Sequence, residues 1–112
     1  MPYTITEQKQ YPQSPDEVLQ AALGAVEGLQ GKVLNSSDSQ VEAKFDKKIH
    51  GKVLGDRTHL KVTVSNSGSG VTVDLEAYPI DPVGRKLQFG ARKGVTRTVV
   101  DWYWAHLEHR LV

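Results

Sequence analysis

Cationic residues gather just before the predicted last helix of the chain. Residues 89–96 read FGARKGVT, so Arg92 and Lys93 stand among small residues, and Arg97 follows within the first helical turn. A helix start offers unpaired amides and the positive end of the helix dipole, which both favour an anion. The segment therefore predicts a site for a phosphate, a carboxylate, a lipid head group or an RNA backbone. It is not a P-loop, because the Gly-Lys-Ser/Thr ending is absent.

A second cationic segment lies earlier in the chain. Residues 44–61 carry six basic and two acidic residues, and residues 85–100 carry five basic residues and no acidic one, although the net charge of the whole chain is only +1. We expect these cations to form an exposed basic surface. The simplest interpretation is that they only meet solvent, and the functional interpretation is that they bind an anionic partner. The predicted basic patch consists of Lys47, Lys48, Lys52, Arg57, Arg85 and Lys86.

Aromatic residues are concentrated in the same last helix, predicted from about residue 94 or 95 to Arg110. Both tryptophans of the chain, Trp102 and Trp104, lie there beside Tyr103. The apolar arc of this helix includes His106 and covers about 200° of the helical wheel. This arc is wider than packing against one face of a sheet requires. Core packing is the simplest explanation, and a ligand cavity or a dimer interface are the alternatives. The predicted ligand-binding residues are Arg92, Lys93, Arg97, Trp102 and His106.

The sequence gives little support to catalysis or metal binding. His106 and His109 are one helical turn apart, a spacing that can share a metal, but a third ligand is not in sight and the chain has no cysteine. Asp74 and Glu76 share one face of a predicted strand, where such carboxylates usually only meet solvent. We therefore predict no catalytic residue, no metal and no cofactor.

The elements that position these residues can be predicted from capping signals and periodicity. Ser14-Pro15-Asp16-Glu17 is a capping box that begins a helix, and apolar residues from Val18 to Leu29 line one side of it. Before it, residues 3–11 alternate as a strand, and residues 41–45, 60–64 and 71–77 alternate in the same way. Such alternation predicts an antiparallel sheet with one buried face and one wet face.

The order of these elements predicts an α+β fold. A strand, a helix, four or five strands and a long helix follow one another without a linker or repeat, so residues 1–112 should form a single domain. Each helix has one apolar face and so has the sheet. We expect a curved antiparallel sheet of five to six strands with both helices on one face.

The first third of the chain resembles the START/Bet v 1-like (SRPBCC) helix-grip superfamily. The likeness rests on the opening strand, on residues 12–19 (PQSPDEVL) and on the long helix that ends the chain. The motif order is also similar to that of small uncharacterised bacterial single-domain proteins. The chain is shorter than that superfamily, with one helix between the first strand and the rest. The resemblance implies a helix-grip fold and an apolar ligand between the sheet and the long helix.

The residues together favour a small, non-enzymatic, cytoplasmic protein, since no secretory signal or membrane span is predicted. It would bind an amphipathic or anionic small ligand between the sheet and the C-terminal helix. A first alternative is an interaction or homodimerisation module using Trp102 and Trp104. A second is binding to RNA or to an anionic membrane through both basic segments. Nucleic acid is disfavoured, because Tyr78 is the only aromatic residue expected on the wet face of a strand.

Overall fold

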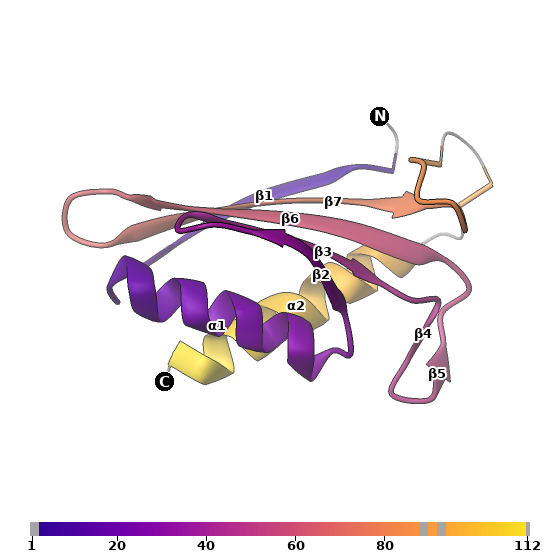
Figure 1. Cartoon of the computed structure of the whole chain (residues 1–112), viewed down its shortest axis with the longest axis horizontal. Coiled ribbons are helices and arrows are strands. Elements are labelled where there is room, and N and C mark those ends of the chain that lie inside the picture. Colours follow the sequence, from indigo (N-terminus) through magenta and orange to yellow (C-terminus); the bar gives the residue numbers. More distant parts are fainter. Residues whose placement is uncertain (1–2, 88–89, 92–93, 112) are drawn as a thin grey trace.

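A five-stranded antiparallel sheet with two helices packed on one face forms the body of the protein (Figure 1). The computed structural model describes residues 3–87, 90–91 and 94–111. The strand order is β1-β7-β6-β3-β2, with β4 and β5 forming a separate two-stranded hairpin. These features confirm the predicted α+β class. The elements are β1 (Ile5–Tyr11), α1 (Pro15–Gly28), β2 (Lys32–Ser36), β3 (Gln40–Phe45), β4 (Lys48–Ile49), β5 (Lys52–Val53), β6 (Arg57–Asn66), β7 (Val71–Ile80) and α2 (Val95–Leu111).

Helix α1 begins where the capping box predicts. The Ser14 hydroxyl accepts from the Glu17 amide at 3.3 Å, and the Glu17 carboxylate accepts from the Ser14 amide at 3.4 Å. Pro15 takes the first helical position, where its missing N–H costs nothing. Two donors that the helix would otherwise leave unpaired are thereby satisfied.

The sheet is built on the long hairpin of β6 and β7. Ten residue pairs register along it, from Arg57 opposite Ile80 to Asn66 opposite Val71. Buried and more exposed residues alternate along both strands, as the sequence predicts. At one edge of the sheet, all five residues of β2 are exposed, and the register slips between Val33 and Asn35.

The region of residues 46–56 differs from the sequence expectation. In the sequence, Gly51 and Gly55 interrupt the alternation of apolar and polar residues, and in the structure both adopt positive φ. The structure adds a short hairpin after β3, with Lys48 opposite Val53 and Gly51 in its turn. Leu87 and Phe89 fit either a short final strand or an ordered loop by their sequence pattern, and in the structure Lys86, which precedes Leu87, forms an isolated antiparallel bridge to Ile80. Phe89 lies outside the described residues.

Tyr103 of α2 connects the sheet and the two helices within the core. Its side chain is completely buried, and its hydroxyl donates to the Ala22 carbonyl of α1 at 3.0 Å. Its ring meets Phe45 of β3 edge-on, with 6.5 Å between ring centroids. One residue thus contacts both the sheet and the other helix, and the space between them is filled with side chains.

Two glycines of α1 let the end of α2 come close. A Cβ atom on Gly28 would lie 2.7 Å from both His106 Nδ1 and Arg110 Nη2, and one on Gly24 would lie 2.6 Å from Arg110 Nε. Because these two glycines have no side chain, this side of α1 leaves room for His106 and Arg110 of α2.

The buried hydrogen bond of Tyr103 makes a direct test of this core. We expect Tyr103→Phe to lower the free energy of unfolding by about 1 kcal/mol, because a buried hydrogen bond is lost without a change of shape. The melting temperature should fall by about 4 °C. Tyr78→Phe, on the opposite face of the sheet, is the control and should change stability by less than about 0.5 kcal/mol. Equal melting temperatures for wild type and Tyr103→Phe would contradict this role.

Candidate functional site

Described residues from both basic segments lie at the same end of the molecule. Pairing of β6 with β7 places Arg57 opposite Ile80, and Ile80 in turn bridges to Lys86. Figure 1 shows the β4–β5 hairpin and the segment that follows β7 projecting at this end, where α2 begins. We call this end of the molecule the cationic end, because the residues of the predicted basic patch lie there. Its residues are Lys47, Lys48, Lys52, Arg57, Arg85 and Lys86.

Acidic residues only partly offset this charge. Residues 46–57 and 80–87 hold six Lys or Arg and three Asp. The Asp46 carboxylate lies 3.7 Å from Arg57 Nε. The Asp81 carboxylate accepts from the amides of Val83 and Arg85, both at 2.9 Å, and these backbone hydrogen bonds hold the pKa of Asp81 below its ordinary value. Asp81 therefore braces its own turn, and the cationic end keeps a positive excess.

The β4–β5 hairpin is attached to both helices. Ile49 is buried in the core, and the His50 amide donates to the Gln30 side-chain oxygen at 2.8 Å. The His50 ring also donates through Nε2 to the Gly28 carbonyl at 2.6 Å, since a carbonyl can only accept. On the α2 side, the Lys52 ammonium lies 5.6 Å from the centroid of the Trp102 ring. The hairpin thus covers part of α2 with a cation over a half-buried aromatic ring.

The structure separates the predicted ligand-binding residues. Trp102 and His106 face the hairpin and α1, where burial, followed by the neighbouring Arg110, lowers the pKa of His106. Arg97 faces β1 instead, and its guanidinium lies 2.8 Å from both Glu7 and Asp101. The charge of Arg97 is therefore already paired. Arg92 and Lys93 lie outside the described residues.

A row of hydrogen bonds and ion pairs centred on Glu7 and Glu108 joins β1 to α2, and we call it the polar seam. It was not predicted from the sequence. Glu7 accepts from Trp104 Nε1 at 2.7 Å and from Arg97, whose hydrogen bond is the main reason that the pKa of Glu7 is lowered. The signal available was that Glu7 and Lys9 alternate in phase with Ile5 and Tyr11, which places all four on the helix side of β1.

The other half of the seam is centred on Glu108 of α2. Its carboxylate accepts from the Tyr11 hydroxyl at 2.8 Å and from the Lys9 ammonium at 3.2 Å. The Tyr11 hydrogen bond, followed by that from Lys9, lowers the pKa of Glu108. Lys9 also lies 4.7 Å from the Trp104 ring centroid. These contacts attach the long helix to the edge strand.

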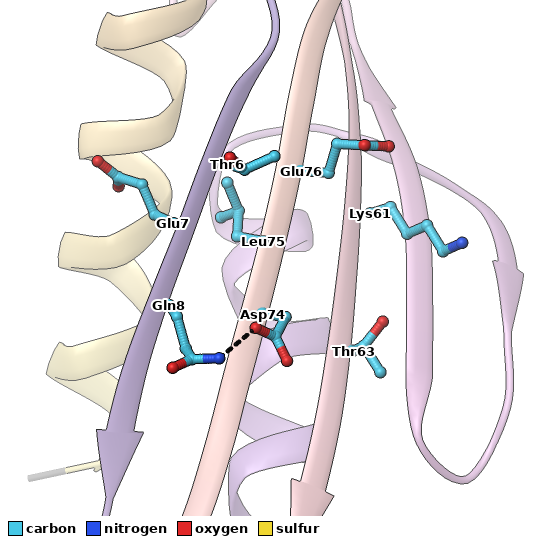
Figure 2. Close-up of a pocket in the computed structure, with 8 residues that line it drawn as sticks. All are labelled: Thr6, Glu7, Gln8, Lys61, Thr63, Asp74, Leu75 and Glu76. Carbon is cyan, nitrogen blue, oxygen red and sulfur yellow. Dashed lines mark hydrogen bonds between the residues drawn. The ribbon is translucent and has the colours of Figure 1, made fainter.

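A hollow lies on the solvent side of the sheet. It has a volume of about 450 Å³ and is lined by Leu75 and by polar residues of β1, β6 and β7, among them Asp74, whose carboxylate accepts from Gln8 at 2.7 Å (Figure 2). Figure 2 also shows Glu7 directed to the other side of β1, towards α2. Two smaller hollows lie at the ends of the sheet, and none of the three is lined by a residue of α2.

The solvent side of the sheet also holds a ring stack near the cationic end. The rings of His59 and Tyr78 are nearly parallel, with 4.9 Å between their centroids, and His59 Nε2 lies 3.4 Å from the Glu42 carboxylate. Lys86 lies 4.4 Å from the Tyr78 ring centroid. Tyr78 is thus engaged by its own neighbours rather than presented for base stacking.

Within the described ranges, no group of three His, Asp or Glu residues is placed to hold a metal ion. Within the same ranges, neither helix is long and apolar enough to cross a membrane.

Solved structures with the same fold were found at low sequence identity. Protein MLL2253 from Mesorhizobium loti is 16% identical over 96% of both chains, with a TM-score of 0.61. Protein CV1439 from Chromobacterium violaceum is 12% identical over 97% of this chain and 96% of its own, with a TM-score of 0.57. Ara h 8.0201, a Bet v 1 allergen, is 10% identical over 97% of both chains, with a TM-score of 0.60.

These similarities define the fold of the protein. No family model matches the sequence, and no curated protein matches it significantly. The chain nevertheless adopts the helix-grip fold of the Bet v 1-like proteins, which confirms the resemblance that its opening strand, capping box and last helix indicated.

The seam on β1 predicts a specific acid sensitivity. The pKa of Glu7 lies below its ordinary value of 4.5, so its contribution to stability is complete above about pH 4.5 and is lost as the pH falls through the lowered pKa. We expect Glu7→Gln to lower stability at pH 7 by about 1 kcal/mol and to reduce the loss on acidification.

Urea unfolding at a series of pH values measures this effect. Glu76→Gln, on the solvent side of the sheet, is the matched control. A Glu7→Gln variant whose stability falls with acid as steeply as that of the wild type would show that the seam does not carry this pH dependence.

Proposed function

We propose that the protein binds an amphipathic or anionic small molecule at the cationic end, between the sheet and α2 and beside the β4–β5 hairpin. The observation that carries this proposal is the meeting of two basic segments that are distant in sequence. Pairing of Arg57 with Ile80, and of Ile80 with Lys86, brings them to one end of the sheet. An anion at this end would be attracted by the combined field of cations on both sides of the sheet, with Lys52 on the α2 side and Lys86 on the solvent side.

The charge distribution supports this end over the opposite one. The turns at the opposite end of the sheet, residues 12–17, 36–39 and 65–70, carry three acidic residues and no Lys or Arg. Charges are screened over about 8 Å at physiological salt, so a ligand responds chiefly to the end that it approaches. An anionic group is therefore attracted to one end and repelled by the other.

The apolar part of such a ligand would lie against Trp102. That ring is only partly buried, and Lys52 covers it from the hairpin. The interior itself is filled by Ile49, Phe45 and Tyr103. A ligand that reached between the sheet and α2 would have to draw Ile49 and the hairpin outward, and the free energy of that opening would subtract from its affinity.

The aromatic residues argue against the alternative of dimerisation through α2. Trp104 is only 4% exposed, and its indole N–H is already paired with Glu7. Trp102 is covered by Lys52 of the same chain. An interface centred on these rings would first have to release both contacts, so the small-ligand proposal fits this helix better.

Calorimetric titration with dodecyl phosphate, below its critical micelle concentration, tests the proposal with a defined amphipathic anion. We expect Lys52→Ala to weaken its affinity about fivefold, because one charge near the ligand is removed. Lys61→Ala removes a charge from the solvent side of the sheet and should change the affinity less than about twofold.

A native mass spectrum of the protein purified from cells supplies the second measurement. A mass in excess of the 12.4 kDa chain would reveal a retained ligand. The proposal would be wrong if dodecyl phosphate did not bind, or if Lys52→Ala and Lys61→Ala weakened it equally.

A further inference from the structure

Two valines at the cationic end are unusually exposed. Val83 is 80% exposed and Val53 is 68% exposed, the two highest values among the large apolar side chains that the structure describes. Val53 lies on β5, and Val83 lies in the turn that follows β7. Both elements project at the same end of the molecule (Figure 1). A single exposed apolar residue is common on protein surfaces, but these two valines both lie at the one end where the cations gather.

Both valines are held in place by their local structure. The Asp81 carboxylate accepts from the Val83 amide, and the Asp81 carbonyl accepts from the Gly84 amide at 3.0 Å. Gly84 takes a φ of +99°, which a side chain would strain. Val53 is paired with Lys48 in the hairpin. The exposure of the valines is therefore built into a braced turn and a paired strand.

Each valine also has cations close to it in the chain. Lys52 precedes Val53, and Lys48 pairs with it, while Arg85 and Lys86 follow Val83 by two and three residues. Apolar tips surrounded by Lys and Arg are the pattern by which proteins bind anionic bilayers, because the apolar groups enter the interface while the cations meet the head groups.

We infer that the cationic end docks on the surface of an anionic lipid bilayer, with Val53 and Val83 inserted into the interface. This goes beyond the proposed function, since the partner is a bilayer and no small molecule need be bound. A fluid bilayer accepts two separate apolar tips without the shape complementarity that a protein partner demands. RNA would use the cations but gain nothing from the valines. The acidic turns at the other end face away from the lipid in this orientation.

Sedimentation with phosphatidylcholine vesicles, with and without phosphatidylglycerol, tests the inference. We expect binding only when phosphatidylglycerol is present, and weaker binding as salt is added. Val53→Ser/Val83→Ser should reduce the partition coefficient about tenfold, because two apolar anchors are lost. Val33→Ser/Leu34→Ser changes two exposed apolar residues of β2 and is the matched control, with less than about a twofold effect expected. Lys48→Ala should reduce partitioning about fivefold.

The same variants separate this inference from the proposed function. Val53→Ser/Val83→Ser should bind dodecyl phosphate as the wild type does, so a failure of dodecyl phosphate binding leaves the vesicle result standing. The melting temperature of each variant shows that it is folded. The inference is overturned if vesicles without phosphatidylglycerol bind equally well, if the valine variant binds like the wild type, or if a single-stranded RNA oligomer binds while vesicles do not.

Discussion

The arrangement of the whole protein depends on holding a long helix across the inner face of a sheet. Along the centre of α2, apolar packing does this together with the hydrogen bond from the Tyr103 hydroxyl to the Ala22 carbonyl, where Tyr103 is completely buried between α1 and the sheet. Along one side of α2, two carboxylates complete the attachment. Glu7 accepts a hydrogen bond from the Trp104 indole, and Glu108 accepts one from the Tyr11 hydroxyl. Because hydrogen bonds have directions and apolar contacts do not, these pairs fix the rotation of α2 about its axis.

That rotation decides which residues can meet a ligand. It turns Arg97 towards β1 and leaves Trp102 beneath the β4–β5 hairpin. The candidate site is therefore formed by a surface that α2 shares with the hairpin, and its charge comes from segments outside the helix. The strand topology brings these two segments together. The β4–β5 hairpin comes just before β6, and the antiparallel pairing of β6 with β7 returns the chain to that same end of the sheet before α2.

Much of the fold could be predicted from local signals. The capping box at Ser14 and the alternation in β6 and β7 each depend on neighbouring residues, so the sequence shows them directly. The seam could not be found in this way, because Glu7 and Arg97 are 90 positions apart and alternation reports the face of a strand but not its partner. The short hairpin was missed because two-residue strands carry no periodicity. The basic patch was visible as composition, whereas its gathering at one end required the strand order.

The irregular edge strand β2 has a consequence for the solubility of the domain. A sheet edge with free backbone groups is a template for adding a strand from another molecule, and β2 also exposes Val33 and Leu34. The slip in register between Val33 and Asn35 interrupts the even spacing of donors and acceptors that such an addition needs. The bulge therefore limits growth of the sheet into aggregates, and this edge is protected by its shape rather than by charge.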